Sequence, residues 1–399
     1  MTRSPDVLVI GAGVIGLAVA WRCLGRGMAV TVVDPAPGSG ASWTAAGMLA
    51  PVTELHYGEQ PLLQLNLASA ARYPAFAAEL VEATGAAIGY RRTGTVVAAW
   101  DGADLAALRD LAAFAASLGQ TVQSLTGRDM RGLIPGIAPG LPGGLLAEDD
   151  HQVDNRLLHG ALLAAVTGSR GVVVPEVVAR IDIADGRVRG VTTAGGTVRS
   201  AGTVVLCAGA HSGRIGGLPS AARPRVHPVK GQTLRLRLPV DALPPRILRG
   251  SVKGSPVYLV PRAPRSAPAE PGRAPAASSV GELVIGASSE EAGFDCAPRA
   301  GAVYELLRDA QSLLPAVSEA ELVEVSTALR PGSPDNAPII GPAGPGGPEG
   351  LIIATGHYRN GILLTPITGD GVSALIADGA LPPELLSFQP ERLGPQEVR

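Results

Sequence analysis

The hydrophobic pattern at the N-terminus changes its period twice. Residues 7–12 form an apolar, β-branched run that ends in glycine, and residues 29–33 form a second apolar run. Between them, residues 14–25 carry the Leu, Ala and Ile of a helix. A strand, a helix and a strand in so few residues predict a βαβ unit, in which a helix crosses over two parallel strands.

Three further segments carry apolar residues at intervals of three and four, which predicts helices. They are residues 65–80, 105–118 and 156–166. Between residues 172 and 208 the pattern changes to short alternating runs, punctuated by Asp185-Gly186 and Gly195-Gly196, which favour hairpin turns. This stretch predicts a small antiparallel meander that returns through a buried strand at 203–207.

The C-terminal half predicts a second β-rich region. Leucines at 234, 236 and 238 alternate with Arg235 and Arg237, so we expect one buried face and one face in water. Other strands are expected at 256–260, 282–287, 322–329 and 350–354, followed by a helix at about 371–377. The tract 263–279 contains Pro, Ala, Ser and Arg with almost nothing to bury, and it predicts a mobile surface loop.

A GxGxxG motif joins the first strand to the first helix. Gly11 allows a tight turn, Gly13 lets backbone approach a pyrophosphate, and Gly16 lets the helix pack closely on the strand. Asp34 ends the second strand, about twenty residues later, where it can accept hydrogen bonds from ribose hydroxyls. The motif in this context predicts a dinucleotide site, but it does not choose between NAD and FAD.

Four later segments resemble the signature segments of a known family. They are Ser42–Pro51 (SWTAAGMLAP), Tyr258–Arg262 (YLVPR), Leu329–Asp335 (LRPGSPD) and Gly356–Leu364 (GHYRNGILL). In sequence and in order, across nearly the whole chain, they are similar to those of the glycine oxidases of the thiamine biosynthetic pathway, which belong to the D-amino-acid-oxidase-like flavoenzymes. The combination is specific, whereas any one segment alone is not.

The resemblance implies an α/β fold with FAD as the cofactor. It implies a Rossmann-like FAD-binding domain of the glutathione-reductase type, which we expect in residues 1–85, 145–225 and 325–385. It also implies a mixed α+β substrate domain, expected in 86–144 and 226–324. No cysteine adjoins the segments at Arg330 or His357, so we expect the FAD to be held without a covalent bond.

The expected FAD contacts combine the fingerprint with residues carried over from the resemblance. They are Gly11, Gly13, Val14, Ile15, Gly16, Asp34, Ser42, Thr44, Ala45, Ala46, Gly47, Met48, Leu49, Val177, Ala208, Gly209, Arg330, His357, Tyr358, Arg359, Asn360, Gly361 and Ile362. His357 is expected to shape the flavin site rather than to act as a base, because loss of hydride from a neutral amine needs no catalytic base.

Four residues are expected at the substrate. Arg330 should bind the substrate carboxylate, since a planar guanidinium makes two charge-assisted hydrogen bonds to it, and Tyr258 should help. Arg359 should lie near both flavin and substrate. Ser289 stands where the family has a methionine in the pocket, and it could admit a different side chain. The alternatives are a solvated arginine at the end of a strand, a core tyrosine, and an arginine that caps a helix.

The composition of the chain argues against several classes of binding partner. The formal net charge of the 399-residue chain is −2, which argues against nucleic acid and anionic membranes, because both require a basic face. Three scattered cysteines indicate neither disulfides nor a zinc site. The histidines at 151, 159, 211 and 227 are expected in capping or surface roles, and no metal is expected. We expect a cytoplasmic homo-oligomer, a dimer or a tetramer.

The expected reaction is oxidative deamination of glycine, and of sarcosine or small D-amino acids, with dioxygen reduced to hydrogen peroxide. Its imine product would supply thiazole synthesis in the thiamine pathway. Two alternatives stay open: an amine oxidase or dehydrogenase for a larger amine in secondary metabolism, and a flavin subunit that passes electrons to a partner protein.

Overall fold

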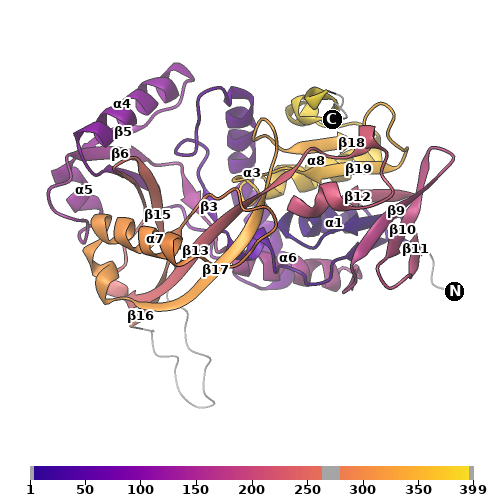
Figure 1. The fold of residues 1–399 in the computed structure, drawn as a ribbon, viewed down its shortest axis with the longest axis horizontal. Helices are drawn as coiled ribbons and strands as arrows, with labels where there is room; N and C mark the ends of the chain where they lie inside the picture. Colours follow the sequence, from indigo (N-terminus) through magenta and orange to yellow (C-terminus); the bar gives the residue numbers. More distant parts are fainter. Residues whose placement is uncertain (1–3, 263–278, 395–399) are drawn as a thin grey trace, which may run out of the picture.

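The computed structural model describes residues 4–262 and 279–394, so residues 263–278 of the expected surface loop lie outside the described residues. Two sheets occupy opposite ends of the molecule (Figure 1), and the long strands β13 (His227–Pro239) and β17 (Glu321–Gly332) lie side by side and reach toward its middle. In the described ranges, no helix is long and apolar enough to cross a membrane.

The first sheet has six strands in the order β18-β19-β12-β1-β2-β8. Their bounds are Ile339–Pro342, Leu351–Thr355, Thr203–Leu206, Val7–Ile10, Val30–Val33 and Val172–Val174. All neighbours pair in parallel except β18 with β19. The strand β8 therefore belongs to this sheet and not to the expected meander, because it extends the parallel register beside β2.

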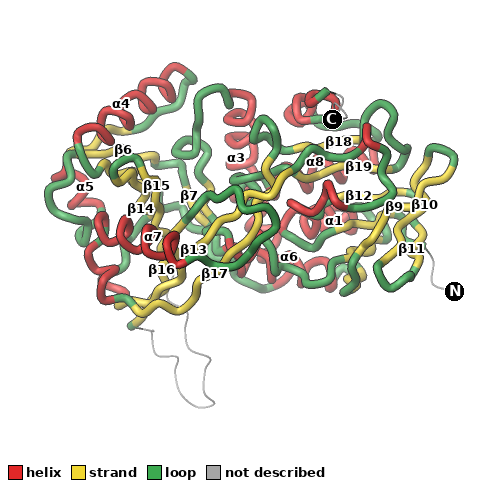
Figure 2. Tube along the Cα trace, viewed as in Figure 1, coloured by secondary structure: helices red, strands yellow, loops and turns green. Residues whose placement is uncertain are grey.

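Helices and a small sheet cover the two faces of this first sheet (Figure 2). One face packs against α1 (Val14–Gly25), α3 (Gln60–Thr84), α6 (Asn155–Gly168) and α8 (Thr365–Asp378). The other face packs against the antiparallel sheet β9 (Val178–Ala184), β10 (Arg187–Thr193) and β11 (Val198–Ser200). Asp185 and Gly186 both have positive φ, as the predicted hairpin turn between β9 and β10 requires.

The second sheet has eight strands in the order β17-β13-β16-β15-β14-β4-β6-β5. The bounds of the last six are Val280–Gly286, Ser255–Arg262, Ile247–Val252, Thr95–Ala99, Gly143–Ala147 and Gln123–Thr126. The helices α4 (Gly102–Ser117), α5 (Gly127–Leu133) and α7 (Ala300–Leu313) lie at this end of the molecule, with α5 and α7 close to one face of the sheet. A short helix α2 (Ala41–Thr44) and the strand β3 (Met48–Leu49) follow β2 in the sequence. The strand β3 pairs with β7 (His151–Gln152), which follows β6.

Alternation along the second sheet separates a core face from a face that looks toward the first sheet. Leu234, Leu283 and Leu259 point into the core beneath α7, whereas Val260 and Val284 point the opposite way and pack against Ala46. The expected α/β fold with a mixed second domain is confirmed. Since β17 belongs to the second sheet, we propose that the third cofactor stretch begins after Gly332 rather than at residue 325.

One side-chain environment in the second sheet was predicted wrongly. Arg237 is exposed, but Arg235, expected in water, is buried with 1 % of its surface accessible. The alternation is correct, because Arg235 does point away from the core beneath α7. The face that carries it is covered by the N-terminal end of α6, where Asn155 lies against the guanidinium.

Candidate active site

The site is a single large cavity between the two sheets, with a volume of about 790 Å³. It contains nearly every residue expected from the sequence. All four expected substrate residues line it, and so do all the expected FAD contacts except Gly16 and Leu49. Gly16 is packed against the carbonyl of Gly11, as its predicted packing role requires, and Leu49 belongs to the buried core instead.

The fingerprint forms one end of the cavity. Gly11 has a φ of 105°, and a Cβ there would overlap the carbonyl of Cys207, so only glycine fits this turn. Asp34 accepts from the backbone N–H groups of Ala12 at 2.8 Å and Ala36 at 2.8 Å, which fixes its carboxylate beside the glycine turn. A tight glycine turn at a helix N-terminus, beside an acid, has the right form for a dinucleotide.

The structure separates the two histidines beside the fingerprint: His159, expected in a surface or capping role, is buried, whereas His211 is exposed as expected. His159 is buried, and its Nε2 lies 2.9 Å from the carbonyl oxygen of Ala12, so it supports the glycine turn from below. His211 lines the cavity and packs against Phe294. Both come from segments distant in sequence from the fingerprint, so no local pattern indicated their positions.

The middle of the cavity is bounded by the segment after α2 and by the turn after β19. Thr44 to Met48 form one wall, and Val14 donates its N–H to Ser42 Oγ at 3.1 Å. His357 forms part of the other wall; it is buried, its Nε2 lies 3.0 Å from Thr368 Oγ1, and burial lowers its pKa to about 3. His357 is therefore neutral near pH 7 and offers no positive charge to the site.

This buried imidazole predicts acid-sensitive stability. An unfolded histidine gains a proton as the pH falls below about 6.5, whereas folded His357 stays neutral down to about 3, so stability is lost across this window. Between pH 7 and pH 5, we expect the wild type to lose about 2 kcal/mol more unfolding free energy than His357→Asn, measured by urea denaturation with FAD present. Burial raises the pKa of Asp150 to about 6 and opposes this trend, but equally in both proteins. Equal losses of unfolding free energy in the two proteins would refute the lowered pKa of His357.

The end of the cavity that holds the expected substrate residues, named the substrate end below, is built across four adjacent strands. Arg330 on β17 lies over Gly231 on β13, and Tyr258 on β15 lies over Gly286 on β16, because a Cβ at either glycine would overlap the side chain above it. Arg330 Nη1 donates to the carbonyl oxygen of Ser288 at 3.1 Å. Burial raises the pKa of Tyr258, so its hydroxyl keeps its proton near neutral pH.

Arg330 does not lie at the end of its strand as expected, since β17 continues through Pro331 to Gly332. This is possible because β17 is the edge of its sheet, where a missing N–H interrupts no ladder. Arg359 lines the cavity, stacks on Tyr358 and lies 3.0 Å from His56 Nε2 through its Nη1. Ser289 lines the same end.

Sequence reasoning missed an ion pair in the cavity wall. Glu54 and Arg249 are 2.5 Å apart, and both line the substrate end. They come from segments about two hundred residues apart, and neither segment carries a known motif at these positions. Among the described residues, no group of His, Cys, Asp and Glu is arranged to hold a metal ion.

The glycine beneath Arg330 provides a direct test of the site. We expect Gly231→Ala to fold and to bind FAD, because a strand accepts alanine, but to push the guanidinium aside and raise the KM for glycine. A displacement of about 1 Å can cost roughly 100-fold in rate. Steady-state kinetics would measure the effect, with Gly160→Ala as the control, since that glycine faces open space. Unchanged kinetics in Gly231→Ala would show that Arg330 does not act from this position.

A fingerprint at one end of the cavity and an arginine with a tyrosine at the other define the class of a dinucleotide-dependent enzyme. The family described as FAD dependent oxidoreductase (DAO) matches residues 6–375. The chain belongs to this family, and its cofactor is FAD. The fingerprint, Asp34 and the walls from Thr44 to Met48 and from His357 to Ile362 would hold it.

Two sequence relatives and one crystal structure show which kinds of protein the chain is similar to. The chain is 35% identical to the bifunctional protein ThiO/ThiG of Synechocystis, over 98% of this chain but only 54% of that protein, so it spans about half of that relative. It is 34% identical to the glycine oxidase of Geobacillus kaustophilus, with 94% of both chains covered. The crystal structure of that glycine oxidase matches with a TM-score of 0.85 at 33% identity, covering 98% of this chain and 99% of the other.

Two cysteines line the cavity even though no cysteine is adjacent in sequence to the segments at Arg330 and His357. Burial raises the pKa of Cys207, so its sulfur stays a thiol, and the backbone carbonyl of Cys296 accepts from Thr327 Oγ1. We still predict non-covalent FAD, because the buried Cys207 thiol is a poor nucleophile and the exposed Cys296 is far in sequence from the segments at Arg330 and His357. Acid precipitation should leave a yellow supernatant over a colourless pellet, and a yellow pellet would contradict this prediction.

Proposed function

We propose that this chain oxidises glycine, and also sarcosine or small D-amino acids. The overall reaction is glycine, dioxygen and water to glyoxylate, ammonia and hydrogen peroxide. The observation that carries the proposal is the pairing of Arg330 and Tyr258 over two glycines, because it brings a carboxylate-binding guanidinium and a hydroxyl donor into the wall of one cavity. The glycine oxidase among the relatives supports the same substrate.

The residues of the chain position the substrate. Arg330 binds the carboxylate through its guanidinium, and the protonated Tyr258 hydroxyl donates a second hydrogen bond to it. FAD, held by the fingerprint, Asp34 and the wall from Thr44 to Met48, would supply the acceptor for the two electrons and the hydrogen of the substrate Cα–H bond and the route from there to dioxygen. The substrate amine must be neutral for this reaction, and His357, which lies against Thr368 and whose pKa burial lowers to about 3, is too weak a base to take its proton.

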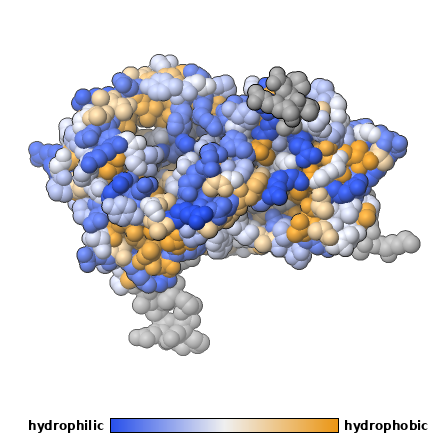
Figure 3. Space-filling model, viewed as in Figure 1, coloured by the Kyte–Doolittle hydropathy of each residue, from blue (hydrophilic) through white to orange (hydrophobic). Residues whose placement is uncertain are grey.

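The released imine fits a role in assembling the thiazole of thiamine, and we include that role in the proposal. The chain also carries exposed apolar side chains near one end of the second sheet, at Tyr304, Leu322 and Val323, and Figure 3 shows apolar surface gathered toward the α7 end of the visible face. Such a patch favours association with a second copy, so we propose a homo-oligomer.

A spectroscopic experiment tests the function directly. Glycine added under nitrogen should bleach the oxidised flavin spectrum, and air should restore it. Failure of glycine to bleach the spectrum would refute the proposed substrate. Bleaching without recovery in air would favour a second candidate, a flavin subunit that passes electrons to a partner. The 27% identity to a hydrogen cyanide synthase subunit, HcnC, of Pseudomonas aeruginosa makes this candidate worth testing.

A further inference from the structure

The Glu54–Arg249 pair lies in the wall of the substrate end, and the proposed reaction does not use it. The side chains are 13% and 16% exposed, and their charged groups are 2.5 Å apart. An ion pair at such a position is expensive to keep unless it has a function, because both charges have lost much of their hydration. Its position beside the substrate suggests a role in choosing substrates.

Strand pairing fixes the position of Arg249, and hydrogen bonds of Thr53 fix the turn that carries Glu54. Arg249 on β14 is the cross-strand neighbour of Tyr258 on β15, so the sheet sets its position. Arg249 Nη1 also donates to Thr53 Oγ1 at 3.2 Å. Thr53 in turn donates from its hydroxyl to the buried carboxylate of Asp150 at 2.6 Å and from its N–H at 2.7 Å, which holds the turn that carries Glu54.

Charges of both signs lie in the wall around Tyr258. Arg330, Tyr258, Glu54 and Arg249 all line the same cavity, and Arg249 is the cross-strand neighbour of Tyr258. Burial raises the pKa of the Tyr258 hydroxyl most; beyond burial, Arg330 and Arg249 lower this pKa, whereas Glu54 raises it. The pocket therefore presents a positive group for the substrate carboxylate at Arg330 and a negative group at Glu54.

We propose that Glu54, held by Arg249, is a specificity-determining residue that rejects substrates with a second carboxylate. This inference rests on the proposed function. A substrate whose first carboxylate lies on Arg330 would place an N-substituent or a side chain toward the far wall. Glycine and its N-alkyl derivatives bring no negative charge there. N-carboxymethyl amines and acidic D-amino acids would bring a carboxylate against Glu54, and like charges in a water-poor site repel strongly.

The variant Glu54→Gln tests this proposal. It removes the negative charge with little change of shape and leaves the Arg249 guanidinium without its carboxylate partner. We expect kcat/KM for N-carboxymethylglycine to rise at least about tenfold relative to kcat/KM for glycine. The ratio of two substrates in one preparation does not depend on how much of the variant is folded. Thiodiglycolate, in which sulfur replaces the reacting nitrogen, should bind about tenfold more tightly, as measured by the change in the flavin spectrum.

Two further variants make the outcome decisive. In Glu54→Gln/Arg249→Gln the gain toward N-carboxymethylglycine should be smaller but still present, because the repulsion by Glu54 is gone while no cation is left to attract the second carboxylate. Glu59 lies five residues after Glu54, outside the cavity wall, and its carboxylate accepts a hydrogen bond from Asn336. Glu59→Gln removes this carboxylate and should leave the ratio unchanged. An unmoved ratio in Glu54→Gln, or a gain that vanishes completely in the double variant, would overturn the inference while glycine oxidation stands. If wild type oxidises neither substrate, the proposed function itself fails.

Discussion

Arg330→Ala should fold and retain its FAD spectrum, while glycine reduces the flavin far more slowly or only at much higher concentration. Removing one partner of a buried charge pair costs on the order of 2–5 kcal/mol, which corresponds to a loss of roughly 30-fold to several thousand-fold in kcat/KM. The loss should appear in anaerobic stopped-flow reduction by glycine, because this experiment isolates the reductive step.

Two comparisons distinguish a carboxylate clamp from a structural arginine. Arg330→Lys should recover only part of the activity, because a point charge does not reproduce the two-pronged guanidinium. An amine without a carboxylate should be oxidised equally slowly by wild type and by Arg330→Ala. If glycine turnover survives the alanine substitution almost unaltered, the substrate site at Arg330 and Tyr258 must be abandoned.

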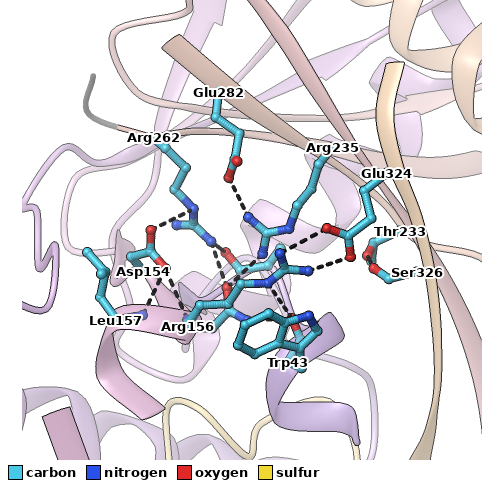
Figure 4. Close-up of polar contacts among 12 residues, drawn as sticks. Trp43, Asp154, Arg156, Leu157, Thr233, Arg235, Arg262, Glu282, Glu324 and Ser326 are labelled. Carbon is cyan, nitrogen blue, oxygen red and sulfur yellow. Dashed lines mark hydrogen bonds and ion pairs between the residues drawn. The ribbon is translucent and has the colours of Figure 1, made fainter. Parts of the chain in front are cut away.

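The second large effect is expected in stability. Figure 4 shows a polar cluster in which Arg235 bonds Glu282 while Arg156 bonds Glu324 through two hydrogen bonds of 2.6 and 2.9 Å. Burial lowers the pKa of Arg235, which shows how strongly its charge needs a partner. Glu282→Gln leaves this buried cation without its carboxylate, and we expect the unfolding free energy to fall by about 3 kcal/mol.

The chain offers a matched control on the same strands. Arg237 and Glu321 form an ion pair at 3.8 Å, with side chains 55% and 66% exposed. Because water screens this pair, Glu321→Gln should change the unfolding free energy by less than about 1 kcal/mol. Thermal denaturation at equal FAD concentration would compare the two variants. Equal effects would mean that the cluster in Figure 4 contributes no more than a surface ion pair.

The cluster in Figure 4 also holds a wall of the cofactor cavity. Arg262 donates to the carbonyl oxygens of Ala46 at 2.6 Å and Val153 at 3.0 Å, and Thr233 Oγ1 donates to the carbonyl of Thr44 at 3.0 Å. Thr44 and Ala46 line the cavity. The substrate sheet therefore sets the position of the segment that lies against the cofactor.

Local pattern predicted the N-terminal unit well. The helix expected at 14–25 is observed at Val14–Gly25, and the two flanking strands are each within two residues of their expected bounds. Period and glycine spacing suffice there, because the strand, the helix and the next strand follow one another directly in sequence. The resemblance supplied the residues of the cavity, since its segments come from the two walls that meet there.

Long-range partners were not predictable from pattern. The burial of Arg235, the support of the glycine turn by His159, and the Glu54–Arg249 pair all depend on segments far apart in sequence. A periodicity of two shows that a side chain alternates faces, but it does not show whether the outer face is covered by another part of the chain. Such partners have to come from the structure.

The glycines beneath Arg330 and Tyr258 bear on any attempt to make this enzyme more robust. Glycine in the interior of a strand weakens the strand, so propensity-guided redesign would replace Gly231 and Gly286 with β-branched residues. Those substitutions would strengthen the sheet while filling the space in which both side chains lie. A library selected for heat resistance alone should therefore accumulate well-folded, yellow and inactive proteins, and these two positions should be held fixed.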